Sequence, residues 1–213
     1  KWHTNRWKAY LKYKKFNPLA LPLSILGTAA IIPMVLKLNQ LYKYFFPVME
    51  KLKSLSRPLF AVNSHFDIIL LLLTVCITPA VCEEALFRGY FQRTLERRWK
   101  IFIAIPVSGL LFALFHKSPL GLPVLTVVGI YLGLLFYAFD SLWISMFTHL
   151  LYNALIIAVT NIPAAQMPLV FNSSGSVKNT VFISSVVTFL LITVLIIILF
   201  PGKRHRKSYI KQE

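Results

Sequence analysis

The amino-acid sequence predicts an all-α fold, a polytopic bundle of transmembrane helices. Hydrophobic residues make up 57% of the 213 residues, whereas charged residues make up only 14%. A chain of this length cannot bury so much apolar surface in one water-soluble core. The mean hydropathy of +0.67 and the long uncharged runs agree with this interpretation. We therefore expect a single integral membrane domain that covers residues 1–213 and has about six spans.

Six apolar segments approach the length that a bilayer core requires, roughly 20 residues for a helix. Prolines lie inside or at the edges of several segments, but membrane helices tolerate proline where neighbouring groups bond to the freed carbonyls. Helix is therefore a better prediction than strand for each of them. In chain order, the predicted spans are Leu19–Leu36, Ile68–Leu86, Ile101–Phe115, Leu122–Phe139, Leu142–Thr160 and Thr180–Phe200.

The six segments differ in how closely they resemble regular transmembrane helices. The first contains two prolines, the second ends in charged residues, and the third is short. The fifth carries a histidine near its middle, and the last, with VFISSVVTFLLITVLIIILF, is the cleanest. The polar residues of the second, third and fifth segments are therefore the unusual feature of the chain.

The net charge of +16 would suit nucleic-acid binding, but the distribution of the charges argues against it. No stacking-aromatic or groove-reading module surrounds the basic residues, so we expect no nucleic-acid partner. Most basic residues fall in three regions that six spans would place on one side, which the positive-inside rule assigns to the cytoplasm. These are Lys1, Arg6, Lys8, Lys12, Lys14 and Lys15; Arg88, Arg93, Arg97, Arg98 and Lys100 in a loop after the second span; and Lys203, Arg204, Arg206, Lys207 and Lys211.

This distribution predicts a multi-pass protein of a cell membrane with both termini in the cytoplasm. The basic clusters are also suited to contacts with anionic lipid head groups, because such charges attract the negative membrane surface.

One region, Lys37–Phe66, does not fit this scheme, because it carries five basic residues on the expected outer side. Its apolar residues recur at helical spacing, so part of it is predicted as an amphipathic helix in the membrane interface. A solvated loop is the alternative, and an additional membrane pass here would invert the topology upstream. The apolar positions are Leu41, Phe45, Val48, Met49 and Leu52.

The two cysteines, Cys76 and Cys82, lie six residues apart in one apolar segment. That spacing suits neither a metal-binding pair nor a disulfide within one helix. We expect both to be small buried residues.

Several ionisable side chains lie within membrane depth. Glu83 and Glu84 are two of only seven acidic residues, His116 ends the third span, and His149 lies near the middle of the fifth. Such groups are costly in a bilayer, usually face the bundle interior and mark function. Three helices thus each contribute one polar cluster.

Helical geometry assigns provisional roles to these residues. Glu84 and Arg88 share a helix face at i,i+4, whereas Glu83 points about 100° away and has no neighbour on its own helix. Arg88 should therefore hold Glu84 and leave Glu83 free. His149 and Asn153 also lie at i,i+4, where an imidazole and a carboxamide can stabilise a developing oxyanion.

Pro79, just before the glutamates, is expected to disturb the second span. Proline has no N–H, so it removes one bond from the helix ladder and frees the carbonyl of Val75. The gap could open the bundle to water next to the acidic pair.

Purely structural interpretations exist for each cluster. Glu84 with Arg88 is explicable as a buried ion pair, His149 with Asn153 as interhelical hydrogen bonds, and His116 as an interfacial residue. Together, however, they leave Glu83 unexplained. Proton transport is a further alternative, but the inverted repeats and matched broken helices of a carrier are not found.

Three motifs stand on successive apolar segments: Glu83-Glu84-x-x-x-Arg88, Phe112-x-x-x-His116 and His149-x-x-x-Asn153. Together they resemble the signature of the CPBP family, which comprises CAAX proteases and bacteriocin-processing enzymes and is also called the Abi family. The resemblance covers residues 67–160 and rests on all three motifs occurring in order on successive apolar segments.

The resemblance implies an intramembrane glutamic endopeptidase. Glu83 would activate water with help from His116, and Glu84 with Arg88 would orient the site or contact the substrate. His149 and Asn153 would form the oxyanion hole. The substrate would be a peptide or protein, either of CAAX type or a bacteriocin or pheromone. The short chain without extra domains looks more like the bacterial members of the family, so the resemblance implies a bacterial cell membrane. A non-proteolytic scaffold or a bacteriocin self-immunity protein of the same family is the alternative.

A zinc site made of Glu83, His116 and His149 is a further possibility, because two histidines and one carboxylate can hold zinc with a water in the open position. Against it, the HExxH spacing is missing, and the sequence offers no carboxylate as a second partner of His149. The resemblance favours the glutamate mechanism, so no cofactor is expected.

Overall fold

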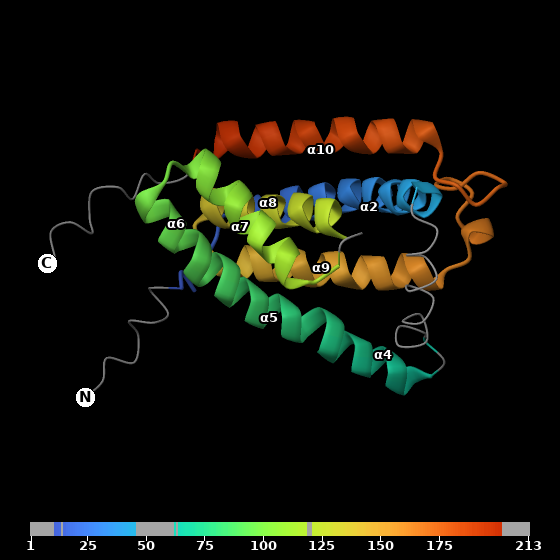
Figure 1. Ribbon diagram of the computed structural model, residues 1–213, viewed down its shortest axis with the longest axis horizontal. Helices are drawn as coiled ribbons and strands as arrows, with labels where there is room; N and C mark the ends of the chain where they lie inside the picture. Colours follow the sequence, from blue (N-terminus) through green and yellow to red (C-terminus); the bar gives the residue numbers. More distant parts are fainter. Residues whose placement is uncertain (1–10, 14, 46–61, 63, 119–120, 202–213) are drawn as a thin grey trace, which may run out of the picture.

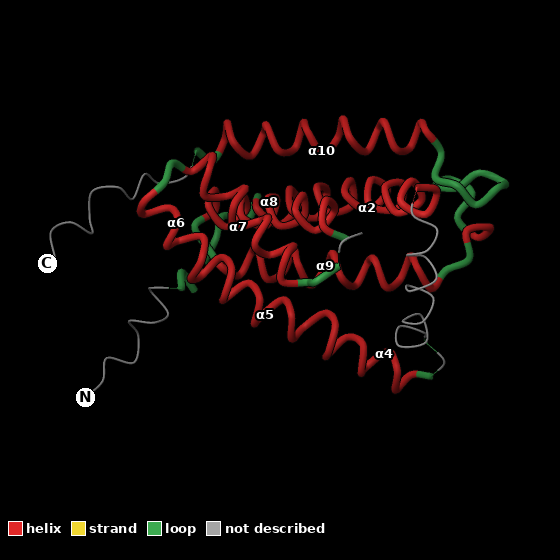
Figure 2. The backbone as a smooth tube through the Cα atoms, in the orientation of Figure 1, coloured by secondary structure: helices red, strands yellow, loops and turns green. Residues whose placement is uncertain are grey.

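The computed structural model describes residues 11–13, 15–45, 62, 64–118 and 121–201. Within these ranges the regular structure is helical, apart from one isolated bridge between Phe171 and Val177. Figure 2 shows helices joined by loops, with no strand drawn. The predicted all-α class is therefore confirmed.

The helices lie side by side in a bundle (Figure 1). One long rod, residues 65–98, crosses the bundle obliquely and is built from five successive segments. The elements are α2 (Ala20–Phe45), α4 (His65–Leu71), η2 (Leu72–Ile77), α5 (Thr78–Glu84), η3 (Ala85–Gln92), α6 (Arg93–Arg98), α7 (Ile101–Phe115), α8 (Leu122–Phe139), α9 (Leu142–Asn161), η4 (Ala164–Gln166) and α10 (Asn179–Leu199).

Among the described residues, five helices are long and apolar enough to cross a membrane, and α7 is a shorter apolar helix of 15 residues. All six predicted spans are therefore helices, but α7 falls short of the usual length. The exposed faces of the rod and of α10 are covered with large aliphatic side chains. Such surfaces require lipid rather than water, so the chain is an integral membrane protein.

Two predicted boundaries are wrong. Leu41 and Phe45 belong to α2, which runs on to Phe45, rather than to a separate interfacial helix; Val48, Met49 and Leu52 lie outside the described residues. The stretch after the second span, expected as a loop, is helical up to Arg98. Between Ala85 and Arg98 no proline interrupts the chain and most residues are good helix formers, so the helix continues.

The core lies around α8, which packs against α7, α2 and α9. Helices α7 and α8 cross where two glycines meet, Gly109 and Gly129. A Cβ atom on Gly129 would lie 2.8 Å from the Cα atom of Gly109. Small residues allow such close helix approaches in membrane proteins, where packing replaces the hydrophobic driving force. This crossing brings the backbone of α8 within reach of the rod.

The amino-terminal segment docks on the corner between α8 and α9. The carbonyl of Lys12 accepts a hydrogen bond from the backbone N–H of Leu142 at 3.1 Å, and the ammonium group of Lys12 pairs with Asp140. The Tyr13 ring packs edge-on against Trp143, with 5.2 Å between the ring centroids. These contacts fix the start of α9, the helix that carries His149.

The expectation for the cysteines is half correct. Both are free, but Cys76 is buried and Cys82 is exposed. Six residues of a helix rotate a side chain well away from the starting face, so one segment facing both lipid and protein cannot bury both positions.

The crossing of α7 and α8 yields a test of the packing. Gly129→Ala should lower the free energy of unfolding by roughly 1–3 kcal/mol, because the new methyl group must overlap the Gly109 backbone. Thermal unfolding in detergent measures the effect. The matched control is Gly121→Ala, whose Cβ would meet only side-chain atoms of Ser118 and Leu125. Equal melting temperatures for the two variants would contradict the close crossing.

Candidate active site

Glu84 and Arg88 form an ion pair in the bundle interior. Arg88 Nη1 lies 2.9 Å from Glu84 Oε1, and neither side chain is exposed. The Nη2 atom of Arg88 donates to the carbonyl of Gly129 at 2.9 Å. The guanidinium carbon lies 4.6 Å from the ring centre of Phe112. The i,i+4 pairing expected from the sequence is present, and it also joins the rod to α7 and α8.

His149 on α9 bonds to the same carboxylate. Its Nδ1 lies 2.9 Å from Glu84 Oε1, and only 2% of the residue is exposed. The sequence analysis found no carboxylate partner for His149, and that conclusion was wrong. Glu84 precedes His149 by 65 residues, and no local pattern connects two helices that meet only in the folded chain.

Glu83 lies close to two imidazoles. Its Oε2 atom is 3.7 Å from Nε2 of His116 and 3.9 Å from Nε2 of His149. The same oxygen is buried without a direct hydrogen-bond partner, although 31% of the side chain is exposed. Glu83 thus has no partner on its own helix, as its position predicted, and helices α7 and α9 bring the two histidines to it.

The hydrogen atoms of both imidazoles can be assigned from their partners. His116 Nδ1 lies 2.8 Å from the carbonyl oxygen of Phe112, which can only accept, so this nitrogen must carry a hydrogen. His149 Nδ1 faces the carboxylate of Glu84, which is ionised by its pair with Arg88, and must donate as well. Both histidines therefore turn their Nε2 atoms toward Glu83.

Asn153 lies one turn after His149 on α9, but its amide is already engaged. Nδ2 of Asn153 donates to the carbonyl oxygen of Val75 at 2.8 Å. This carbonyl is the one that Pro79 was expected to free, because Pro79 occupies the position four residues later. The structure thus brings Asn153 to the rod at Val75.

The rod departs from regular α-helix on both sides of the glutamates. Segments η2 and η3 are π-helical, and the N–H of Thr78 bonds to the carbonyl of Leu73, five residues earlier. Wider turns of this kind are common at functional sites. They rotate α5 relative to a regular helix and therefore help to decide which neighbours Glu83 and Glu84 meet.

Gln92 is a site-supporting residue that the sequence analysis missed. It is fully buried, and its Nε2 donates to the carbonyl of Gly133 at 3.0 Å and to Glu96 Oε1 at 2.8 Å. Arg88 and Gln92 thus bond to Gly129 and Gly133 in the same register, two rungs between the rod and α8. The Gly-x-x-x-Gly spacing on α8 was the available signal, because it marks close helix approach in membranes.

The zinc possibility does not fit this geometry. Among the described residues, no group of three His, Cys, Asp or Glu side chains is arranged to hold a metal ion. Glu83, His116 and His149 converge, but not as a ligand set. No step is therefore derived through a metal.

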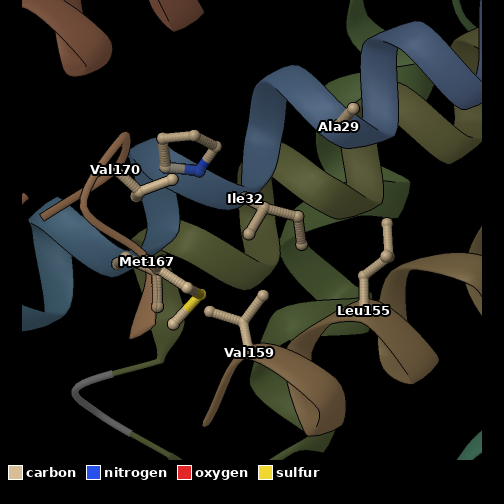
Figure 3. A pocket seen from close by; sticks show the side chains of 8 residues that line it. Ala29, Ile32, Leu155, Val159, Met167 and Val170 are labelled. Atoms are coloured by element: carbon tan, nitrogen blue, oxygen red, sulfur yellow. The ribbon is translucent and has the colours of Figure 1, made fainter. Parts of the chain in front are cut away.

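A separate cavity of about 220 Å³ lies between α2, α9 and the segment 167–170 (Figure 3). It is lined by Ala29, Ile32, Pro33, Leu36, Leu155, Val159, Met167 and Val170. These side chains offer no acid, base or charged group, so the cavity cannot perform hydrolysis. The chemistry belongs instead to the cluster around Glu83.

Comparison with known proteins agrees with this location. Residues 65–155 match the family described as type II CAAX prenyl endopeptidase Rce1-like. This segment is similar to that family. The match begins with α4 and ends within α9, so it includes all the motif residues that indicated the CPBP family. No significant match was found among curated proteins or among solved structures.

The site geometry predicts that substitutions at the two glutamates affect the stability of the fold differently. Arg88→Ala and Glu84→Ala should each destabilise the protein by roughly 3–5 kcal/mol, because each leaves a buried charge without its partner. Glu83→Gln keeps the shape of a side chain that has no direct hydrogen-bond partner at Oε2, and it should change stability little. Melting temperatures in detergent give the comparison. A loss for Glu83→Gln as large as that for Arg88→Ala would refute the division of roles.

Proposed function

We propose that the chain is an intramembrane endopeptidase that uses Glu83 to activate water. The observation that carries this proposal is the position of Glu83 Oε2, 3.7 Å and 3.9 Å from two imidazole nitrogens and without a direct partner. Both distances are too long for direct hydrogen bonds and suit a bridging water molecule. The Rce1-like match supports the class of reaction, since that family consists of CAAX-type proteases.

In the proposed reaction, Glu83 removes a proton from water while the water oxygen attacks the peptide carbonyl. A bond forms between the water oxygen and the carbonyl carbon, and the carbonyl oxygen becomes an oxyanion. The carbon–nitrogen bond then breaks, and the proton passes from Glu83 to the leaving amine. His116 Nε2 orients the water through its lone pair, because Nδ1 is bonded to the Phe112 carbonyl.

His149 is the proposed donor to the oxyanion. Since its Nδ1 hydrogen is bonded to Glu84, Nε2 can donate only when the ring is an imidazolium. Glu84 faces the ring directly and stabilises that positive charge, and Arg88 holds Glu84 in place. A carboxylate that orients and supports a histidine has the same role in other hydrolases. Glu84 and Arg88 thus act through His149.

The site is proposed to open toward the cytoplasm. Glu83 lies near the end of the apolar part of the rod, and the helix continues into a basic stretch in which Arg97 and Arg98 are exposed. Exposed arginines at the mouth would attract a peptide with acidic groups or a free carboxylate, and they would also contact anionic lipids. The proposed substrates are therefore CAAX-type peptides, with bacteriocin or pheromone peptides as the second class.

Glu83→Gln tests the proposed chemistry. In lipid vesicles, the natural chain should cleave a fluorogenic prenylated CAAX peptide or a peptide found by comparing membrane peptidomes. Glu83→Gln should lower the rate by about 10²–10⁴, because the base is lost, while the variant stays folded. The matched control is Asp67→Asn, which changes an acid in the first turn of α4, at the far end of the rod from Glu83. If the protein were a membrane scaffold or a self-immunity protein, Glu83→Gln would leave its function unchanged. An unchanged rate of peptide cleavage would exclude Glu83 as the base.

The direction of the site can be tested with one introduced cysteine. Arg97 is exposed, whereas Gln92 is buried and would not react. In a Cys76→Ala, Cys82→Ala background, Arg97→Cys should react with a membrane-impermeant thiol reagent only after cells are opened. Labelling of intact cells from outside would reverse the topology.

A further inference from the structure

The apolar cavity of Figure 3 lies near the end of the bundle where α9 ends and α10 begins, and none of its lining residues belongs to the rod that carries Glu83. Its volume of about 220 Å³ is below the roughly 300–1,000 Å³ of pockets that enclose a whole small molecule. All its lining side chains are apolar. We infer that the cavity is a binding site for an anionic phospholipid, with part of one acyl chain inside it and the phosphate beside Lys37.

The length and direction of the cavity suit a lipid chain. Ala29 and Leu36 on α2 both line it, and the seven helical steps between them span about 10 Å. That is about two-thirds of the roughly 15 Å that one leaflet contributes to a bilayer core. On α9, Leu155 and Val159 line it one turn apart and lead toward the same end, because Met167 follows the end of α9. The cavity therefore extends along two membrane-spanning helices.

The surrounding bilayer can reach this cavity. Ala29 is exposed, and Leu155 and Val159 are half-buried, so the wall is open on one side. Ordered water is not a suitable occupant, because the apolar walls offer it no hydrogen-bond partners. An empty cavity loses dispersion contacts along its lining. The chain of an adjacent lipid therefore gains contacts when it enters.

Lys37 on α2 places a positive charge at this end of the cavity. Its Nζ donates to the carbonyl of Val177 at 3.1 Å. The peptide unit that contains this carbonyl also contains the N–H of Lys178, which donates to the carbonyl of Val170 at 3.0 Å. Because Val170 lines the cavity, a single peptide unit links the ammonium group to a residue of the cavity wall.

The charge around this end favours an anionic lipid head group. An ammonium group has three donors, and within the described part of the chain Lys37 uses two of them, on the neutral oxygens of Val177 and Asn179. A phosphate oxygen can accept the third in a charge-assisted hydrogen bond. The described elements around the cavity, α2, α9 and residues 162–178, contain no acidic residue. They therefore offer nothing that would attract the cationic group of a zwitterionic lipid.

Lipid binding to the purified chain tests the head-group contact. In an uncharged detergent, native mass spectrometry should show tighter binding of phosphatidylglycerol than of phosphatidylcholine with the same acyl chains. Lys37→Gln should weaken phosphatidylglycerol binding about tenfold, because one charge-assisted hydrogen bond is lost. The matched control is Lys100→Gln, which removes an exposed lysine between α6 and α7. Equal binding of the two lipids, or equal weakening by the two substitutions, would overturn the site.

Filling the cavity tests the place of the acyl chain. Phosphatidylglycerol should raise the melting temperature of the natural chain by several degrees and that of Ala29→Leu by much less, because the larger side chain occupies the cavity. The matched control is Ala158→Leu, at an exposed position of α9 that does not line the cavity, and it should respond like the natural chain. Glycerol phosphate carries the anion without a chain and should give no shift. A shift as large as that of the lipid would mean a site for the anion alone and would overturn the inference.

Photo-crosslinking to the natural chain locates the lipid even if a variant does not fold. With every methionine replaced by its diazirine analogue, Met167 reports on the cavity that it lines, and Met146, which is buried on α9, serves as an internal control. In phosphatidylglycerol vesicles, light should attach lipid to the peptide that contains Met167 and not to the one that contains Met146. Phosphatidylcholine should give a several-fold lower yield at Met167. Equal yields from the two lipids would mean general contact with the bilayer and would overturn the site. None of these measurements depends on peptide cleavage.

Discussion

Glu84 and Arg88 form an ion pair without solvent exposure, and three helices meet through it. The guanidinium reaches the carbonyl of Gly129 on α8, and the carboxylate reaches His149 on α9. A buried ion pair contributes little net stability, because the loss of hydration offsets most of the attraction. Its value here is geometric. Arg88 holds the Glu84 carboxylate in place, and this carboxylate orients the His149 ring on α9. The Nε2 atom of His149 faces Glu83.

The membrane explains why so many bonds converge on one rod. Backbone and side-chain polar groups inside a bilayer have only each other as partners. The carbonyls of Gly129 and Gly133 accept bonds from Arg88 and Gln92 because no side chain covers them. The carbonyl of Val75, four residues before Pro79, accepts a bond from Asn153. At each of these three places a polar group on one helix has its partner on a neighbouring helix, and these bonds help to determine how the helices pack.

Much of the fold could be predicted from the sequence, because apolar segment length and helical spacing are local properties. They located the six helical segments, the pairing of Glu84 with Arg88 and the isolation of Glu83 on its own helix face. Less of the site was predictable. The bond between Glu84 and His149 joins residues 65 positions apart. The buried place of Gln92 depends on Gly133, where a Cβ atom would lie 2.7 Å from Gln92 Oε1. The exposure of Cys82 and the helical continuation to Arg98 likewise depended on the course of the whole rod.

The sequence by itself determined which residues share a helix face, because the rotation per residue is a property of the backbone. It also determined that residue 79 would donate no bond to the helix ladder, since proline has no N–H. Only the tertiary structure decided which faces meet. The π-helical turns on both sides of α5 and the close crossing of α7 with α8 set the rotation of each helix. The rotation of one helix relative to another depends on packing between distant segments. This rotation placed His116 and His149 close to Glu83 and turned Asn153 toward Val75.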